Sequence, residues 1–264
     1  MNAAQRILTD NVIDFNGFSR KIIRGGLSKK DARLNKDGTV SKVRSHKVAG
    51  ISTEVYAFQS KEELDAMNNV LDNKINNAPD DDKRWIAARN KMMFVIGINI
   101  GLRASDLCGL KYSFFMNEDG SFKQYHSLKP KKTKKTGKYV KLYFNDAVKK
   151  AIENYIVDYP VEDLNEYLFK SREGNSHITE KSLGRIIKNT AEEAGIERNI
   201  CSHSLRKTFG YWAYHKAEDK NNALIILQTI FNHSSPAITS KYIGLTDDEI
   251  SDVFNTLNLG DEFI

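Results

Sequence analysis

The chain has 264 residues, of which 40% are apolar and 28% charged, as is ordinary for a soluble globular protein. No apolar run approaches the length of a membrane span, and the N-terminus lacks the apolar core of a signal peptide. These features exclude a membrane protein and lead us to expect a cytoplasmic one. The two cysteines, Cys108 and Cys201, lack metal-ligand spacing and predict reduced thiols instead of a disulfide framework.

The charge of the chain is unevenly distributed. A net charge of +6 permits a nucleic-acid partner without requiring one. Basic residues outnumber acidic ones over residues 1–50, and residues 129–141 hold a dense run of lysines. Residues 245–264, in contrast, contain six acidic residues and no lysine or arginine. This asymmetry predicts a basic working face and an acidic tail that points elsewhere.

The N-terminal part, residues 1–57, reads as a short helical segment followed by a basic linker. Its apolar residues between Ile7 and Ile23 fit one face of one or two short helices. Residues 27–50 are polar, basic and punctuated by glycine, which is typical of a solvated loop or of a basic arm lying along DNA. We therefore expect the main domain to span residues 58–264.

Helices dominate this main domain. Ser60 and Glu63 fit a capping box, so a helix is expected to start at Ser60. Apolar periodicity predicts three further helices, over residues 83–100, 146–156 and 179–195. Short strands are predicted over residues 112–115, 122–128, 139–144 and 167–169, with a hairpin tip at residues 131–138. The expected fold is mainly α with a small antiparallel β-sheet (α+β).

The segment from Cys201 to Gly244 gathers the side chains that can carry chemistry. His203, Arg206, His233 and Tyr242 are separated by apolar residues at helical spacing. Arginine binds phosphate with a rigid fork of donors, and histidines donate hydrogen bonds or move protons near neutral pH. A tyrosine becomes a usable nucleophile where cations stabilise its phenolate. The set therefore predicts covalent attack on a phosphodiester.

The order of these residues resembles the second conserved box of the tyrosine recombinases, the phage integrase family. The resemblance rests on His203-Ser-Leu-Arg206, on Asn232-His233-Ser-Ser and on the nine-residue offset from His233 to Tyr242. It implies the fold of the family's catalytic domain, with Tyr242 as the nucleophile.

A second stretch, Gly101-Leu-Arg-Ala-Ser-Asp-Leu, resembles the family's first box. By this resemblance Arg103 contacts the scissile phosphate, and Asp106 supports the local fold. An equally good reading makes Asp106 a helix N-cap or a first-turn acid.

The family also carries a catalytic lysine in a β-hairpin. Lys135-Thr136-Gly137 resembles its Lys-Thr-Gly variant, so Lys135 is the candidate, while Lys132 and Lys138 remain open. The other hairpin lysines are candidates for contacts with DNA phosphates; the DNA-binding set is Lys131, Lys132, Lys134 and Lys138.

The resemblance implies a site-specific recombinase that cleaves and rejoins double-stranded DNA through a 3′-phosphotyrosyl intermediate. Arg103, Arg206 and His233 would stabilise the phosphate, His203 would act as general base, and Lys135 would protonate the leaving 5′ oxygen. No cofactor or metal is implied. The expected partners are duplex DNA, further copies of the chain in a tetrameric synapse, and accessory DNA-bending proteins.

Two regions depart from this picture or extend it. Fewer than sixty residues precede the catalytic domain, which is too few for the family's usual helical DNA-binding domain, so the chain reads as truncated, minimal or dependent on a partner. At the other end, residues 246–259 predict an acidic helix, which either packs on its own domain or docks on a neighbouring protomer.

Three other functions fit parts of the pattern. A type IB topoisomerase shares the same site chemistry and would reseal the strand that it cuts. A DNA-binding module without catalysis would use the basic residues alone. A metal-dependent nuclease would use His203 and His233 as ligands.

Overall fold

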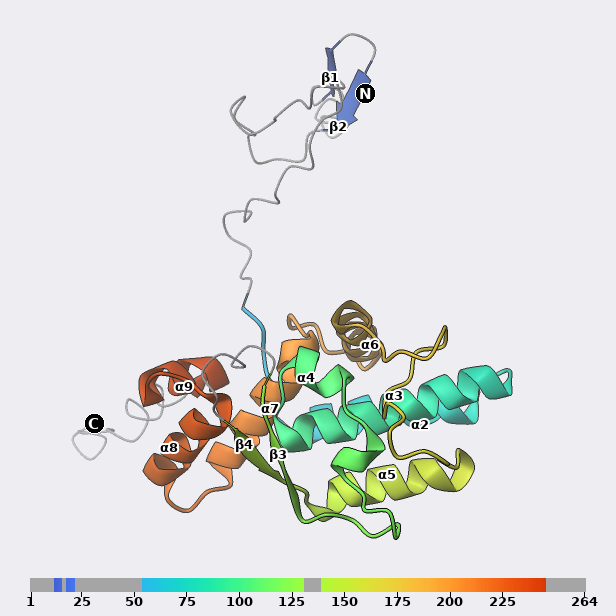
Figure 1. Ribbon diagram of the computed structural model, residues 1–264. Coiled ribbons are helices and arrows are strands. Elements are labelled where there is room, and N and C mark those ends of the chain that lie inside the picture. Colours follow the sequence, from blue (N-terminus) through green and yellow to red (C-terminus); the bar gives the residue numbers. More distant parts are fainter. Residues whose placement is uncertain (1–11, 16–17, 22–53, 131–138, 246–264) are drawn as a thin grey trace, which may run out of the picture. The chain divides into compact units, whose positions relative to one another are not determined.

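The computed structural model describes residues 12–15, 18–21, 54–130 and 139–245 (Figure 1). By its internal contacts the chain divides into two units, Met1–Thr53 and Glu54–Ile264. The C-terminal helix expected after Leu245 and the hairpin tip at residues 131–138 lie outside the described residues.

The first unit contains a β-hairpin where helices were expected. Strands β1 (Val12–Phe15) and β2 (Phe18–Lys21) pair in antiparallel fashion, with Phe15 opposite Phe18. The helix prediction is therefore wrong for these residues. The sequence between the strands is Asn16-Gly17, a dipeptide that is a strong hairpin signal and that outweighs the weak helical periodicity.

The second unit is built mostly from helices whose starts are fixed by side-chain caps. Ser60 Oγ accepts a hydrogen bond from the Glu63 N–H (3.2 Å), and Glu63 accepts one from the Gln59 N–H (2.8 Å). Asp80 caps the next helix through the Lys83 N–H, so that helix begins two residues before the predicted Lys83. The helices are α2 (Lys61–Asn76), α3 (Asp81–Ile100), α4 (Ala104–Cys108), α5 (Asp146–Asp158), α6 (Glu180–Glu193), α7 (Ser202–His215), α8 (Lys220–Phe231) and α9 (Pro236–Ile243).

The sheet of this unit has two antiparallel strands, β3 (Tyr125–Leu128) and β4 (Val140–Tyr143). The prediction of a strand over residues 112–115 is wrong, because Tyr112–Phe114 forms the 3-10 helix η1. A strand would point successive side chains to opposite faces, whereas η1 and Phe115 bury three aromatic rings together. Residues 167–169 form only an isolated bridge, between Tyr167 and Lys111. The predicted fold class, mainly α with a small antiparallel sheet, is confirmed.

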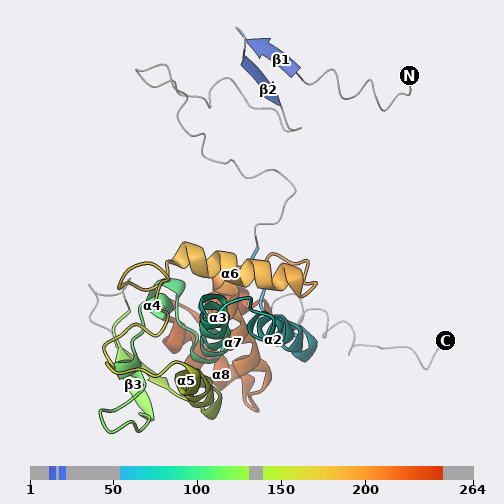
Figure 2. The ribbon, with the colours of Figure 1, turned by 90° about the vertical axis from the view of Figure 1, so that its right-hand side faces the viewer.

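Helix α3 lies at the centre of the main core, between α6 and α5 (Figures 1 and 2). Its Met93 and Ile96 are fully buried, together with Leu205 of α7. A second, smaller cluster forms between α7, α8 and α9; its buried members are Tyr214, Leu227, Phe231, Ile243 and Leu245. Helix α7 therefore belongs to both cores. None of the helices in the described residues is long and apolar enough to cross a membrane.

The segment that enters this unit is hydrogen-bonded to α7. The Phe58 N–H donates to Thr208 Oγ1 (2.8 Å), and Trp212 Nε1 donates to the Phe58 carbonyl (2.9 Å). The Phe58 ring itself is fully buried against Phe94 of α3. The chain is thus fixed to α7 before α2 begins.

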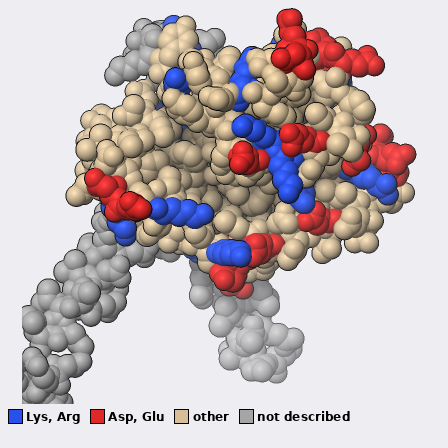
Figure 3. Space-filling model, turned by 90° about the horizontal axis from the view of Figure 1, so that it is seen from below, with Lys and Arg blue, Asp and Glu red and all other residues tan. Residues whose placement is uncertain are grey.

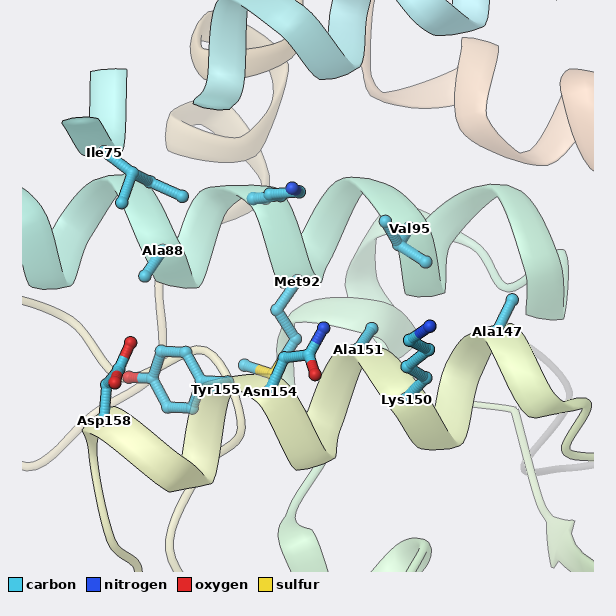
Figure 4. A pocket seen from close by; sticks show the side chains of 11 residues that line it. Ile75, Ala88, Met92, Val95, Ala147, Lys150, Ala151, Asn154, Tyr155 and Asp158 are labelled. Carbon is cyan, nitrogen blue, oxygen red and sulfur yellow. The ribbon is translucent and has the colours of Figure 1, made fainter. Parts of the chain in front are cut away.

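A groove of about 360 Å³ runs between α3 and α5 (Figure 4). Met92 and Val95 line it from α3, and Ala151 and Tyr155 from α5. Its lining residues include none of the predicted catalytic residues, so the groove is separate from the site described below.

At Gly210, helix α7 packs tightly against Phe231 of α8 and Ile243 of α9. A Cβ at this position would lie 2.5 Å from Ile243 Cγ2 and 2.9 Å from the Phe231 ring. We expect Gly210→Ala to lower the free energy of unfolding by about 1–3 kcal/mol through overpacking. The matched control is Gly184→Ala on α6, where the nearest atom would be 3.9 Å away and we expect a gain of about 0.5–1 kcal/mol. Urea unfolding of both variants measures the difference, and equal midpoints would contradict this packing.

Candidate active site

The site begins where α3 ends. Gly101 ends this helix with φ +61°, in the left-handed region that favours glycine, and a Cβ there would lie 2.4 Å from the Phe209 ring. This turn places Arg103 at the N-cap of α4. It also directs the Gly101 carbonyl toward Arg206, whose Nη1 donates to it at 2.6 Å.

Two guanidinium groups meet at one backbone carbonyl. Arg206 Nη2 donates to the Phe231 carbonyl at 3.0 Å, and Arg103 Nη2 donates to the same oxygen at 3.3 Å. The carbonyl is presented by the end of α8, where Asn232 adopts φ 51° and turns the chain. The Phe231 ring also packs under the Arg206 guanidinium, 4.2 Å from its Cζ. Two arginines that are far apart in sequence therefore form a single cationic site.

Tyr242 of α9 joins this pair from within the same chain. Its ring lies edge-on to the rings of His233 (5.1 Å between centroids) and Phe231 (5.4 Å). Arg206 hydrogen-bonds to its hydroxyl, and the charges of Arg206 and Arg103 both favour the phenolate. Burial outweighs them and raises the pKa of Tyr242 above its ordinary value, so the phenol is protonated at neutral pH.

Burial has the opposite effect on the arginine. It lowers the pKa of Arg206 to about 10, an effect that the neighbouring charge of Arg103 reinforces and Tyr242 opposes. The guanidinium remains charged at neutral pH. Asp106, a buried acid in the first turn of α4, also helps to keep the Arg206 charge in place. Its backbone N–H donates to the Arg103 carbonyl at 3.0 Å. Asp106 therefore interacts with Arg103 through the backbone and with Arg206 through its charge.

His233 is oriented by a threonine. The Thr239 hydroxyl donates to the Ser235 carbonyl (3.5 Å), so its oxygen accepts from His233 Nδ1–H at 3.0 Å. This arrangement leaves Nε2 as an acceptor in the neutral ring and a donor in the imidazolium. Burial lowers the pKa of His233, and the charges of Arg206 and Arg103 lower it further.

The other predicted residues are His203 and the hairpin lysines. His203 is the second residue of α7, one turn before Arg206, and its side chain is exposed. Lys135 and the other hairpin lysines, Lys131, Lys132, Lys134 and Lys138, fall in the residues whose structure is not described. The structure thus brings together Arg103, Arg206, His233 and Tyr242 from three separate stretches of sequence.

Sequence reasoning missed Lys207 and the bonding role of Thr239. The Lys207 ammonium lies 5.5 Å from the centre of the Tyr242 ring. Consecutive helical residues point about 100° apart, so adjacency to Arg206 did not predict a shared target. The bond between Thr239 and His233 depends on the turn that starts α9, which the sequence pattern does not reveal.

The face of the unit seen in Figure 3 does not match the predicted basic working face. Acidic and basic side chains lie next to one another over its right-hand part, and a broad area on the left is uncharged. A DNA backbone needs a surface dominated by positive charge. The mixed charge of this face therefore does not suit it to a DNA backbone.

Comparisons with known proteins identify the family to which the chain belongs. The Phage integrase family matches residues 60–249. The probable integrase/recombinase YoeC of Bacillus subtilis (strain 168) is 37% identical over 169 residues, which cover 63% of this chain and 84% of YoeC. The tyrosine recombinase XerC of Halalkalibacterium halodurans is 23% identical over 168 residues, covering 64% of this chain and 54% of XerC. The chain thus spans about half the length of that relative.

Solved structures show the same fold. The crystal structure of XerA recombinase superposes with a TM-score of 0.55 at 18% identity, covering 80% of this chain and 67% of XerA. XerH recombinase in a post-cleavage complex with its palindromic difH substrate gives a TM-score of 0.56 at 20% identity, covering 83% of this chain and 58% of XerH. The architecture is that of a tyrosine recombinase catalytic domain. This chain belongs to the phage integrase family.

The shared electrostatics of the site can be measured at His233. Because the Arg103 charge disfavours the imidazolium, we expect Arg103→Ala to raise the pKa of His233. Titration of the histidine ring signals by NMR checks this. His126 of β3 is the internal control, since its pKa is lowered by burial and Lys123 and should not respond. An unchanged His233 titration would contradict the proximity of the two groups.

Proposed function

We propose that the protein is a site-specific DNA recombinase, an integrase that cleaves and rejoins duplex DNA through a 3′-phosphotyrosyl intermediate on Tyr242. The observation that carries this proposal is the meeting of Arg103 and Arg206 at the Phe231 carbonyl, beside the Tyr242 hydroxyl. Two donor forks next to one phenol suit a phosphodiester under attack. Membership of the phage integrase family and the relative named an integrase/recombinase support the same reaction.

In the proposed step the Tyr242 oxygen bonds to phosphorus while the bond from phosphorus to the 5′ oxygen breaks. The phenol is protonated in the free protein, so its proton must pass to a base, the role we propose for His203. Lys135 gives a proton to the departing 5′ oxygen. The phosphotyrosyl bond conserves the energy of the phosphodiester, and a 5′ hydroxyl from another strand reverses the step without an energy cofactor.

Charge builds on the non-bridging oxygens of the phosphate as the tyrosine attacks. Arg103 and Arg206 carry donors to meet it, and His233 can donate from Nε2 once protonated. A bound phosphate anion opposes the effect of the arginines on His233 and favours its protonation. The site therefore gains a donor as the substrate enters.

The number of protomers in the proposed complex follows from the number of DNA strands that must be cut. Exchange between two duplexes requires four cleavages, and each chain supplies one Tyr242, which supports a synapse of four protomers on double-stranded DNA. Accessory DNA-bending proteins belong to the same proposal, as does the assignment of residues 58–264 to a catalytic domain.

Trapping of the covalent intermediate tests the nucleophile. DNA captured from a random duplex pool by a Tyr242→Phe variant supplies the sequence for nicked suicide substrates. We expect the wild type to form a covalent protein–DNA species on a denaturing gel and Tyr242→Phe to form none. Tyr143→Phe, on the exposed edge of β4, is the matched control and should react as the wild type does. An adduct formed by Tyr242→Phe would refute the assignment.

The same substrates separate the competing functions. Efficient relaxation of a supercoiled plasmid that lacks the selected sequence would favour a type IB topoisomerase. Loss of cleavage in EDTA would favour a metal-dependent nuclease. Equal DNA binding by the wild type and Tyr242→Phe, with no cleavage by either, would favour a DNA-binding module.

The general acid is tested with an altered leaving group. We expect Lys135→Ala to cleave ordinary DNA about a hundred- to ten-thousandfold more slowly. A substrate with sulfur in place of the bridging 5′ oxygen should restore its rate, because a thiolate leaves without a proton. Lys132→Ala and Lys138→Ala are the matched variants from the same loop. Rescue of one of these in place of Lys135→Ala would reassign the role.

A further inference from the structure

Lys207 places a third cation against the nucleophile. It follows Arg206 on α7, and its Nζ lies 5.5 Å from the centroid of the Tyr242 ring. The side chain is half-buried, unlike the exposed lysines at the end of α7 and the start of α8. The same ring makes T-shaped contacts with His233 and Phe231, so the Lys207 ammonium lies over a ring that is already held in place.

The surroundings of this ammonium act on its charge in two directions. Burial lowers the pKa of Lys207, while the charge of Glu54 and the Cys201 thiol act in the opposite direction. Glu54 belongs to the entry segment, and its carbonyl accepts a hydrogen bond from Asn199 Nδ2 at 2.9 Å. The segment that leads into α2 therefore brings the Glu54 carboxylate near Lys207. Glu54 is not among the groups that act on the charge of Arg206.

The charged and titratable groups around Tyr242 come from several elements, whereas α8 contributes the apolar Phe231 ring. Arg206 and Lys207 come from α7, Arg103 precedes α4, and His233 precedes α9. Cys201, at the N-cap of α7, is the group that opposes ionisation of the phenol. A phenolate spreads part of its charge into the ring, so a cation over the ring is attracted more strongly to the ionised form than to the phenol.

We propose that Lys207 is a positioning residue for Tyr242, which holds the ring through its face and favours the phenolate during attack. This inference rests on the proposed function of Tyr242 as the nucleophile. It assigns to α7 two cations with different targets: Arg206 binds the hydroxyl and the phosphate, and Lys207 acts on the ring.

Titration of the phenol tests the electrostatic part without DNA. Fluorotyrosine placed at position 242 reports ionisation by fluorine NMR. We expect Lys207→Met to raise the pKa of the Tyr242 phenol and Lys207→Arg to leave it near the wild-type value. The matched control is Lys220→Met, because the Lys220 ammonium lies 5.4 Å from the ring of Tyr214, outside the site. A Lys207→Met titration equal to that of the wild type or of the control would overturn the proposal.

The covalent step provides the second readout. On the suicide substrate we expect Lys207→Met to form the adduct about tenfold more slowly, with DNA affinity little changed. A tenfold effect corresponds to a rise of about one unit in the pKa of the Tyr242 phenol. Lys207→Arg should recover most of the rate. The deficit should shrink when position 242 carries a more acidic fluorinated tyrosine, which loss of packing alone would not produce. A deficit that persists unchanged would overturn the proposal.

The NMR titration and the adduct assay distinguish a failure of this inference from a failure of the proposed function. If the wild type forms no adduct, the proposed function fails, while the NMR titration still decides whether Lys207 acts on Tyr242. Urea unfolding identifies a folding defect in Lys207→Met, and Lys207→Gln then replaces it in both measurements with the same expected results.

Discussion

The hydrogen bonds from Arg206 to the Gly101 and Phe231 carbonyls hold the site together. A buried cation is costly unless its donors are satisfied, and each unsatisfied carbonyl would cost about 1–3 kcal/mol. The Arg206 guanidinium satisfies its own donors and both carbonyls with the same two hydrogen bonds. One carbonyl lies at the end of α3 and the other at the end of α8. Both ends are turned by residues with positive φ, Gly101 and Asn232. The Arg206 guanidinium therefore also connects the two hydrophobic cores.

The shared Phe231 carbonyl keeps the two arginines together before any substrate arrives. Like charges repel, and the charge of Arg103 lowers the pKa of Arg206. A backbone oxygen between them offsets part of this repulsion and fixes the direction of both forks. A phosphate oxygen can then take donors that already converge, so little reorganisation is needed during the reaction.

Sequence alone went far with the fold and with the identity of the site. Capping residues such as Ser60 marked helix starts, and the ordered motif residues pointed to Arg103, Arg206, His233 and Tyr242, whose catalytic roles stay predictions. What it missed depends on contacts between distant residues. Nothing local shows that Thr239 orients His233 or that Lys207 reaches the Tyr242 ring. The hairpin of β1 and β2 was missed although Asn16-Gly17 signalled it, because apolar spacing was given more weight than turn chemistry.

The position of α7 across two cores has a mechanical consequence. Leu102 and Ala104, on either side of Arg103, are packed in the larger core, whereas Tyr242 packs on the smaller one. Tyr242, the proposed nucleophile, and Arg103 are thus supported by different hydrophobic cores. Local unfolding of the smaller core would displace Tyr242 while the larger core stayed folded. Activity and global stability need not be lost together.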